Sequence, residues 1–571
     1  MLQLILTILL FLIIVIPVGT YLYHIAAGKH TFADPLFDRI DGLIYRIGGV
    51  DPGKGMSWKG YAGALLATNG IMILTGYLIL RIQSLPILNP NGVGAMEESL
   101  SFNTIISFMT NTNLQHYSGE TGLSYLSQML VITFMMFVSA GSGYAACVAF
   151  IRGLAGKTKD NVGNFFADLI RITTRILIPF SLVGGLLLVW QGVPQNLTGN
   201  IVVDTIEGGR QIIASGPVAA LESIKHIGTN GGGFLGANSA TPIENPTILT
   251  NLIELYSMMI LPGACVITFG KMVRDRKKEK SFTVRCFGRE GRSIFAAMGI
   301  LFLVGLGICF WAESQGNPAL SDVGLDQSMG SMEGKEVRFG VAQSAMFTTT
   351  TTSFTTGTVN NMHDTLTPLG GMVPMLHMML NVVFGGKGVG LMNMIMYAIL
   401  AVFICGLMIG RTPEYLGKKI EGREMKLAAL CIIIHPLLIL AFSALAVALP
   451  AGVEGITNPG FHGLSQVLYE FASSAANNGS GFEGLADNTM FWNITTGLVM
   501  FFGRYLTIII QLAVAGSLMK KRFVNDSAGT LRTDKFSFAV ILVFVVYIFA
   551  ALTFFPALSL GPIAEHLTLW S

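Results

Sequence analysis

Four short clusters of Thr, Asn, Gly and Ser recur along the chain, and these residue types could surround a cation that has lost its water. The first residues of the clusters lie 119, 126 and 122 positions apart. Each cluster follows a short, partly apolar segment and precedes a long apolar one. The clusters are Thr110-Asn111-Thr112-Asn113, Thr229-Asn230-Gly231-Gly232, Thr355-Thr356-Gly357-Thr358 and Asn477-Asn478-Gly479-Ser480.

The chemistry that these clusters could perform is the binding of a monovalent cation. Rings of backbone carbonyls replace the water shell of K⁺ in potassium filters, and glycine allows the φ angles that turn carbonyls inward. Gly231, Gly357 and Gly479 hold the third position, which Thr112 takes in the first cluster. No cluster contains Asp or Glu, which divalent sites usually recruit. One such cluster is typical of an ordinary turn, but four at near-equal spacing favour a K⁺ selectivity filter.

Two basic residues lie midway along apolar stretches, with glycines beside them. Arg504 follows Gly503, and Lys387 stands between Gly386 and Gly388. Intramembrane charges usually mark an ion pathway; the alternative is a snorkelling or internally paired side chain. The glycines predict broken helices, and we expect matching interruptions at residues 141–143 and 262–263. The sequence therefore predicts a gate or plug below the filter.

The composition and the apolar runs of the chain predict the membrane-spanning helices that position these residues. The chain has 571 residues, of which 52% are hydrophobic and 12% charged, and its mean hydropathy is +0.61. Soluble proteins carry about 25% charged residues, so this is a membrane protein. We interpret the first apolar run as a retained helix and not a signal peptide, because it is long and no basic residue precedes it. Runs near the ~20 residues needed to cross a bilayer predict spans at 2–26, 60–82, 123–150, 166–191, 248–272, 293–313, 372–410, 425–450, 490–519 and 537–558.

The segments before the clusters are too short to cross a membrane. Backbone that re-enters the bilayer is tolerated only where it is buried in protein or lines a water-filled cavity. These pore segments are expected at about 99–109, 217–227, 341–352 and 462–474. The predicted fold is an all-α membrane protein with re-entrant pore loops and pseudo-fourfold symmetry. Its four membrane–pore–membrane repeats are 60–165, 166–292, 293–424 and 425–535, with flanking segments 1–59 and 536–571.

The basic residues are unevenly distributed. Of the 36 Lys and Arg residues, 27 fall in five loops that contain none of the clusters. Because cytoplasmic loops collect Lys and Arg, we expect the clusters and both termini on the extracytoplasmic side. The five loops are 27–59, 151–165, 271–292, 411–426 and 520–535.

The sequence predicts no catalytic residues. The glycine-rich run 385–390 lies in an apolar stretch without a preceding strand, which argues against a phosphate loop. No Asp-Lys-Thr-Gly phosphorylation motif occurs, and we find no paired carboxylates or His clusters within the spans. An intramembrane enzyme is therefore disfavoured. The six cysteines have no Cys-x-x-Cys spacing and are expected to be small buried side chains.

Three longer runs carry a family resemblance. The runs are GTNGGGFLGANSATPIENPT (228–247), TVNNMHDT (358–365) and GRTPEYLGKKIEG (410–422). With them the whole chain resembles the potassium-binding, channel-like A subunits of Kdp potassium-transporting ATPases, in the superfamily of potassium transporters with four pore repeats. The resemblance implies a bacterial cell membrane location and a non-catalytic role. It also implies three partners: a P-type ATPase subunit that uses ATP, a single-span accessory subunit and a very small membrane peptide.

The resemblance also implies site roles. The subunit would take K⁺ from outside and pass it through an intramembrane tunnel to the ATPase subunit. Gln115 matches a position linked to ion affinity, and Arg504 matches an arginine below the filter. Lys387 departs from the neutral residue expected there. The repeat pattern alone also permits an autonomous K⁺ channel or symporter of the same superfamily.

Overall fold

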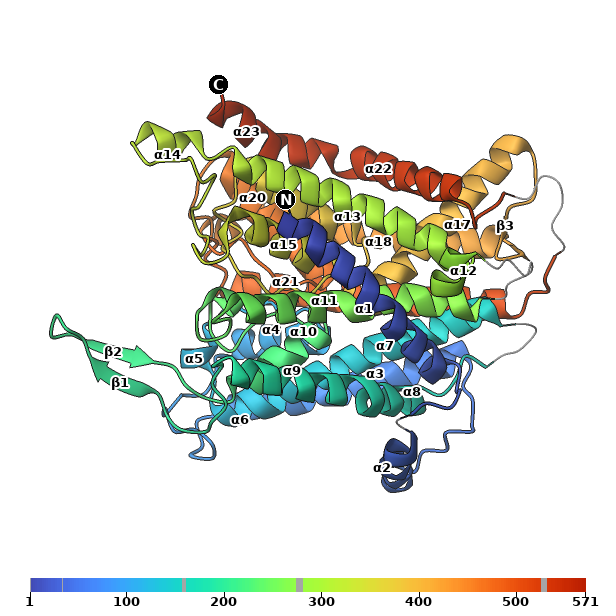
Figure 1. Ribbon diagram of the computed structural model, residues 1–571, viewed down its shortest axis with the longest axis horizontal. Coiled ribbons are helices and arrows are strands. Elements are labelled where there is room, and N and C mark those ends of the chain that lie inside the picture. The colour runs from blue at the N-terminus through green and yellow to red at the C-terminus, as the bar shows by residue number, and fades with distance from the viewer. Residues whose placement is uncertain (1, 33, 157–160, 274–280, 525–530) are drawn as a thin grey trace.

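Ten long apolar helical segments dominate the chain. The computed structural model describes residues 2–32, 34–156, 161–273, 281–524 and 531–571. Within this part of the chain, ten segments are long and apolar enough to cross a membrane, as predicted, and most run along the long axis of Figure 1. They contain α1 (Leu2–Ala26), α3 (Trp58–Ile82), α6–η1–α7 (Tyr125–Ala155), α8–η2–α9 (Phe165–Trp190), α11 (Ile248–Met272), α13 (Gly291–Ser314), α17 (Val389–Ile409), α18 (Gly422–Ala448), α21 (Met490–Met519) and α22 (Phe536–Leu558).

Four shorter helices precede the clusters. They have 12, 10, 14 and 16 residues, hence lengths of about 15–24 Å at 1.5 Å per residue, too short for a ~30 Å hydrocarbon core. All four lie in the left half of Figure 1, whereas α12 (Phe282–Phe287) and β3 (Glu414–Tyr415), beside basic loops, lie at the right. These half-helices are α4 (Glu98–Met109), α10 (Val218–Ile227), α15 (Gly340–Ser353) and α20 (Phe461–Ala476).

Shorter elements complete the described structure. An antiparallel hairpin, β1 (Ile201–Asp204) with β2 (Arg210–Ile213), projects at the left of Figure 1, with Ile201 opposite Ile213. The remaining elements are α2 (Asp34–Gly48), α5 (Gly119–Gly122), η3 (Asn238–Ala240), α14 (Pro318–Asp322), α16 (Pro368–Leu380), η4 (Gly386–Gly388), β4 (Lys418–Lys419, paired with β3), α19 (Pro450–Val453), η5 (Ser559–Ile563) and α23 (Ala564–Leu569).

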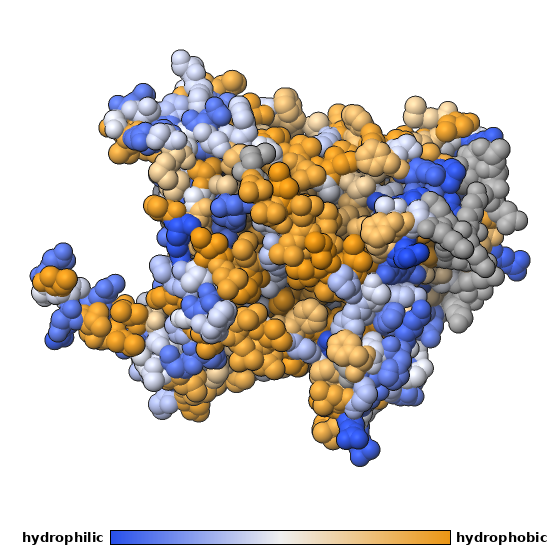
Figure 2. All heavy atoms as spheres, in the orientation of Figure 1, coloured by the Kyte–Doolittle hydropathy of each residue, from blue (hydrophilic) through white to orange (hydrophobic). Residues whose placement is uncertain are grey.

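The outer surface is apolar around the middle of the bundle. Figure 2 shows hydrophobic side chains gathered over the centre of this face and hydrophilic ones toward its left and right ends. Exposed leucines and isoleucines of α1, and exposed Phe544, Ile548 and Leu552 of α22, contribute to the apolar surface. Apolar surface of this extent is expected where lipid replaces water. The chain is therefore a multi-pass membrane protein.

One of the four predicted helix interruptions is present. The predicted span 372–410 is two helices, α16 and α17, separated by an irregular stretch in which Asn381, Phe384 and Lys387 have positive φ. The other three predicted breaks are wrong. Helices α7 (Phe134–Ala155), α11 and α21 continue through residues 141–143, 262–263 and 503–504.

Close packing explains the glycines in these unbroken helices. A Cβ on Gly143 would collide with Arg504 and Lys387, and one on Gly503 would approach the carbonyl of Ala475. Small residues let transmembrane helices approach closely, so these glycines mark helix contacts. Pro262 is accommodated inside α11, as transmembrane helices allow when neighbours satisfy the freed backbone groups.

Candidate ion site formed by the four clusters

Each cluster begins at the carboxyl end of a half-helix. The chain leaves α4, α10, α15 and α20 through residues with left-handed backbone, such as Thr229 (φ 48°) and Asn477 (φ 55°). A helix carboxyl end carries a partial negative charge, which favours a nearby cation. The four helix ends therefore create a negative electrostatic potential at the clusters, which favours a cation there.

The backbone shows that the four clusters share one conformation. In each cluster two residues that lie two positions apart have positive φ, and the residue between them donates its backbone N–H to the carbonyl oxygen five residues back. In the second cluster Gly232 also has positive φ. Thr112 donates to Ser107 O at 2.9 Å and Asn230 to Lys225 O at 2.7 Å. Thr356 and Asn478 donate in the same way to Thr351 and Ser473. The left-handed pairs are Asn111/Asn113, Thr229/Gly231, Thr355/Gly357 and Asn477/Gly479.

This pattern corrects the alignment of the first cluster by one residue. Asn113, and not Thr112, is equivalent to Gly231, Gly357 and Gly479. Asparagine tolerates the left-handed conformation better than most residues, so it can stand where the other repeats use glycine. Thr110 ends half-helix α4, with its hydroxyl donated to Ile106 O at 2.8 Å.

The clusters contact one another in a closed cycle. A Cβ on Gly231 would collide with the Thr356 carbonyl oxygen, one on Gly357 with Asn478 and one on Gly479 with Thr112. These contacts join the second cluster to the third, the third to the fourth and the fourth to the first. The Asn111 amide closes the cycle by donating to Thr229 O at 2.8 Å. Since no side chain fits at these glycines, the four backbones lie side by side.

Asparagine side chains stabilise this closed cycle of four clusters, which we call the ion ring. Asn230 Nδ2 donates to Asn111 Oδ1 at 2.7 Å, and Asn477 Nδ2 donates to Thr112 Oγ1 at 3.0 Å. Asn478 Nδ2 donates to Thr351 O at 2.9 Å. Because these side-chain amides hydrogen-bond one cluster to its neighbours, the backbone carbonyls remain the main oxygens available to an ion. In the described structure the buried amide of Asn113 has no hydrogen-bond partner.

Gln115 and Gly232 lie at the exit of the first two clusters. Gln115 accepts the Gly233 N–H at 2.8 Å and donates to the Gly233 carbonyl at 3.1 Å. A Cβ on Gly232 would stand 2.9 Å from both the Asn113 carbonyl oxygen and Gln115 Oε1. Gln115 thus joins repeats one and two. In the other two clusters the fourth residues, Thr358 and Ser480, bond through their hydroxyls to Ser239 and Asn478.

The two predicted plug residues meet beside the ring. Lys387 donates its backbone N–H to Thr229 Oγ1 at 3.1 Å and its ammonium to Asn477 O at 2.6 Å. Thr229 and Asn477 are the first residues of their clusters. The Arg504 guanidinium and Lys387 Cβ both approach Gly143 of α7. Within the described residues neither charge has a carboxylate partner, and Arg504 Nη1 is buried without a hydrogen bond.

Gly386 and Gly388 shape the chain around this lysine. A Cβ on Gly386 would collide with the Thr229 side chain, and one on Gly388 (φ 79°) would collide with Cys147. These two glycines therefore let the irregular stretch between α16 and α17 pack closely against Thr229 and Cys147. Gly503 lies on α21, where it allows half-helix α20 to approach.

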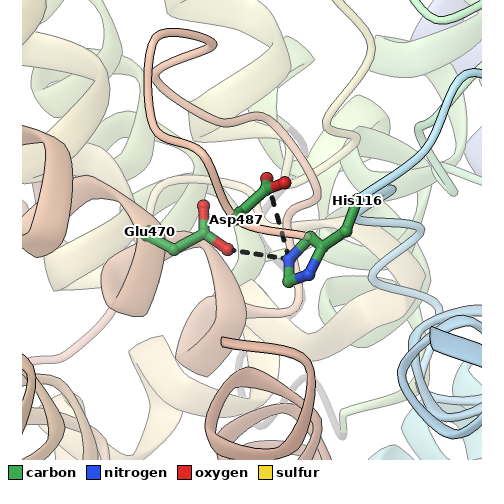
Figure 3. Close-up of side chains that lie close together, drawn as sticks. All are labelled: His116, Glu470 and Asp487. Carbon is green, nitrogen blue, oxygen red and sulfur yellow. Dashed lines mark hydrogen bonds and ion pairs between the residues drawn. The ribbon is translucent and has the colours of Figure 1, made fainter. Parts of the chain in front are cut away.

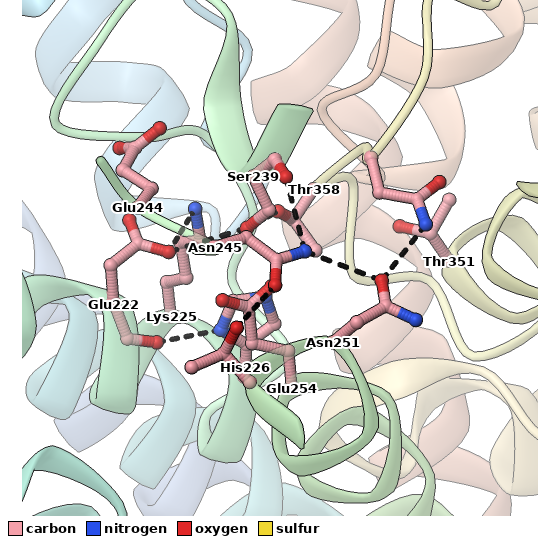
Figure 4. A network of polar contacts seen from close by, with 12 residues as sticks. Glu222, Lys225, His226, Ser239, Glu244, Asn245, Asn251, Glu254, Thr351 and Thr358 are labelled. Atoms are coloured by element: carbon pink, nitrogen blue, oxygen red, sulfur yellow. Dashed lines mark hydrogen bonds and ion pairs between the residues drawn. The ribbon is translucent and has the colours of Figure 1, made fainter. Parts of the chain in front are cut away.

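Sequence reasoning missed a buried ionic network behind the second and third clusters (Figure 4). Lys225 Nζ lies 2.6 Å from Glu222 Oε2, and both side chains are fully buried. Ser239 connects Glu222 to the third cluster. Its hydroxyl donates to the Glu222 carboxylate at 3.3 Å and lies 3.2 Å from Thr358 Oγ1. Burial, followed by the charge of Glu222, raises the pKa of Glu244 well above its usual value. The charge of Lys225, four residues before the second cluster, was the sequence signal that could have revealed this network.

A second missed group lies beside the first and fourth clusters. His116 stands 3.2 Å from Glu470 and 3.8 Å from Asp487, and its other ring nitrogen lies 2.7 Å from Asn493 Oδ1. Burial lowers the pKa of His116, but the charges of Asp487 and Glu470 outweigh burial and raise the pKa to about 9. Because these residues are far apart in sequence, no local sequence pattern could predict that they lie together.

Fold and site together define a membrane protein with four pore-loop repeats around one axis. Residues 5–567 match the family described as KdpA, potassium-transporting ATPase A subunit. The chain therefore belongs to that family. A relative from Clostridium acetobutylicum, named potassium-transporting ATPase potassium-binding subunit, is 57% identical over all of both chains. One of the same name from Caldanaerobacter subterraneus subsp. tengcongensis is 54% identical over 97% of this chain and 96% of the relative.

A solved structure has the same architecture at low sequence identity. The potassium transporter TrkH from Vibrio parahaemolyticus superposes with a TM-score of 0.51 at 15% identity, covering 77% of this chain and 83% of TrkH. At this identity the likeness concerns the fold alone.

Proposed function

We propose that this chain is the potassium-binding subunit of an ATP-driven potassium uptake system. The observation that carries the proposal is the closed cycle of four cluster backbones, each at the carboxyl end of a half-helix. Neutral carbonyls in such a ring replace the water of K⁺ without trapping it by full charge. The names of the full-length relatives support the same role.

The site residues take two roles in this proposal. The backbones of the four clusters form the selectivity filter, and Gln115 fixes its outer rim. Lys387, Arg504 and the glycines beside them close the inner side, because two unpaired positive charges oppose the passage of a cation. K⁺ then leaves sideways, through an intramembrane tunnel, to a P-type ATPase subunit that uses the ATP. The six chain segments defined by the repeats are the units of this architecture.

The setting follows from the charge distribution and the family. The chain resides in a bacterial cell membrane with its filter mouth and both termini extracytoplasmic, since 27 of 36 basic residues occupy the opposite loops. Its partners are the ATPase subunit, a single-span accessory subunit and a small membrane peptide, within membrane lipid.

Potassium-stimulated ATP hydrolysis tests the proposal. The chain is co-purified with the products of the neighbouring reading frames, and ATP hydrolysis is measured against K⁺ and Na⁺ concentration. We expect stimulation by K⁺ at concentrations where Na⁺ has no effect. Absence of that stimulation, together with K⁺ currents from the chain alone in a planar bilayer, would instead establish an autonomous channel.

A further inference from the structure

His116, Glu470 and Asp487 form a compact group outside the ion ring (Figure 3). His116 directly follows Gln115, Glu470 lies on half-helix α20, and Asp487 lies in the segment between the fourth cluster and α21. In Figure 3 both carboxylates point at the same imidazole nitrogen, Nε2. The group therefore joins the first repeat to the fourth at the mouth of the site.

The spacing of these three groups matches the ligand set of a transition metal. Nε2 lies 3.2 Å from Glu470 Oε1 and 3.8 Å from Asp487 Oδ2, and all three ligand atoms lie within 4.8 Å of one another. Zn²⁺ binds His nitrogen and carboxylate oxygen at about 2.0–2.2 Å in a tetrahedron, whose edges are then roughly 3.3–3.6 Å. The two distances from Nε2 are already close to these separations.

The ring of His116 is fixed in a way that suits a metal ligand. Its Nδ1 lies 2.7 Å from the Asn493 side-chain oxygen, which sets the orientation of the imidazole and directs Nε2 at the carboxylates. Metal-binding histidines commonly donate their second nitrogen to such a partner. The side chains of His116 and Glu470 are 0% and 1% exposed, whereas that of Asp487 is 26% exposed. An ion can therefore reach the group past Asp487.

The two carboxylates can accept more hydrogen bonds than the surrounding side chains donate to them. Among the described residues, His116 is the one side chain that donates a hydrogen bond to Glu470, and no side chain donates one to Asp487. A divalent ion would use the remaining acceptor capacity of both carboxylates and would take the place of the proton on His116 Nε2.

We propose that His116, Glu470 and Asp487 form a binding site for a divalent transition-metal ion of the Zn²⁺ class, with water as the fourth ligand. The bound ion bridges the segment after the first cluster to half-helix α20 and to the segment after the fourth cluster. It thereby fixes the outer mouth of the ion site. The metal coordination is independent of the proposed function, and only its effect on the mouth of the ion site rests on that function.

Co²⁺ absorption spectroscopy tests the proposal on the purified full-length chain. Co²⁺ replaces Zn²⁺ in tetrahedral sites and gives visible absorption bands that report the ligand geometry. We expect one Co²⁺ per chain with a tetrahedral spectrum, displaced by Zn²⁺ but not by Mg²⁺, which prefers octahedral oxygen sites. His116→Gln should lower Co²⁺ affinity more than about tenfold, since even changes outside the ligand set cost that much.

Controls separate this site from other histidines and from misfolding. Asp487→Asn, at the partly exposed ligand, should weaken binding while the thermal midpoint without metal stays near that of the parent. His462→Gln is the matched control, because His462 also lies between two carboxylates, Asp364 and Glu565. His462→Gln should leave the spectrum unchanged. The proposal is overturned if the parent gives no tetrahedral spectrum, or if His116→Gln and Asp487→Asn both keep the parent's affinity.

Discussion

Removal of the Lys387 ammonium should strengthen K⁺ binding at the inner end of the proposed filter. The ammonium donates to the Asn477 carbonyl at 2.6 Å, so it occupies an oxygen that an ion in the ring could otherwise share. Lys387→Met keeps a long apolar stem and deletes the charge. The vacated carbonyl then faces the ion site without a tethered cation.

The magnitude follows from Coulomb's law. Two cations that share one carbonyl oxygen lie at most about 6 Å apart, twice a hydrogen-bond length. At an effective dielectric constant of about 20, their repulsion is about 3 kcal/mol. Its loss corresponds to roughly a hundredfold gain in K⁺ affinity. We also expect passive K⁺ flux to rise, because one of the two charges below the ring is gone.

Equilibrium binding of radioactive Rb⁺ and ATP-independent K⁺ efflux from proteoliposomes measure these two effects. Lys418→Met is the matched control. Lys418 is equally buried and also donates to backbone carbonyls, at 2.8 Å to Leu154 and 2.7 Å to Gly156. It lies on β4, which pairs with β3 at the right of Figure 1, away from the half-helices. Affinity and efflux of Lys387→Met within twofold of the parent would refute the reasoning, provided that Lys418→Met leaves both unchanged.

Three further predictions concern the ring, its inner side and its surroundings. Gly357→Ala should abolish saturable Rb⁺ binding, because its Cβ collides with the neighbouring cluster's carbonyl; Gly340→Ala, also at positive φ but in open space, should retain it. Arg504→Ala should raise passive K⁺ efflux from proteoliposomes, and efflux equal to the parent's would count against the plug. His462 has a pKa of about 10, because hydrogen bonds to Asp364 and Glu565 outweigh burial, which lowers it. Its stabilisation is complete below the unfolded pKa of about 6.5 and is lost as pH rises through 10, so the thermal-midpoint difference between the parent and His462→Gln should shrink from pH 7 to pH 10.

Local sequence was sufficient for the helices and for the approximate position of the clusters. The pore segments predicted at 99–109 and 217–227 agree with half-helices α4 (Glu98–Met109) and α10 (Val218–Ile227) within one residue. Hydropathy, segment length and glycine content act over a few residues and do not depend on distant contacts. For the same reason apolar runs alone gave the number of spans, although the run 372–410 combined α16 with α17.

Tertiary contacts decided the register, the breaks and the charge clusters. Thr112 and Asn113 are both plausible partners for Gly231 in sequence, and the positive φ angles of Asn111 and Asn113 distinguish them. A glycine such as Gly143 serves equally in a helix break or in a close helix contact, and its neighbours determine which. His116 lies 354 residues from Glu470 in the chain. Residues so distant meet only when the first and fourth repeats close the ring, which no local pattern encodes.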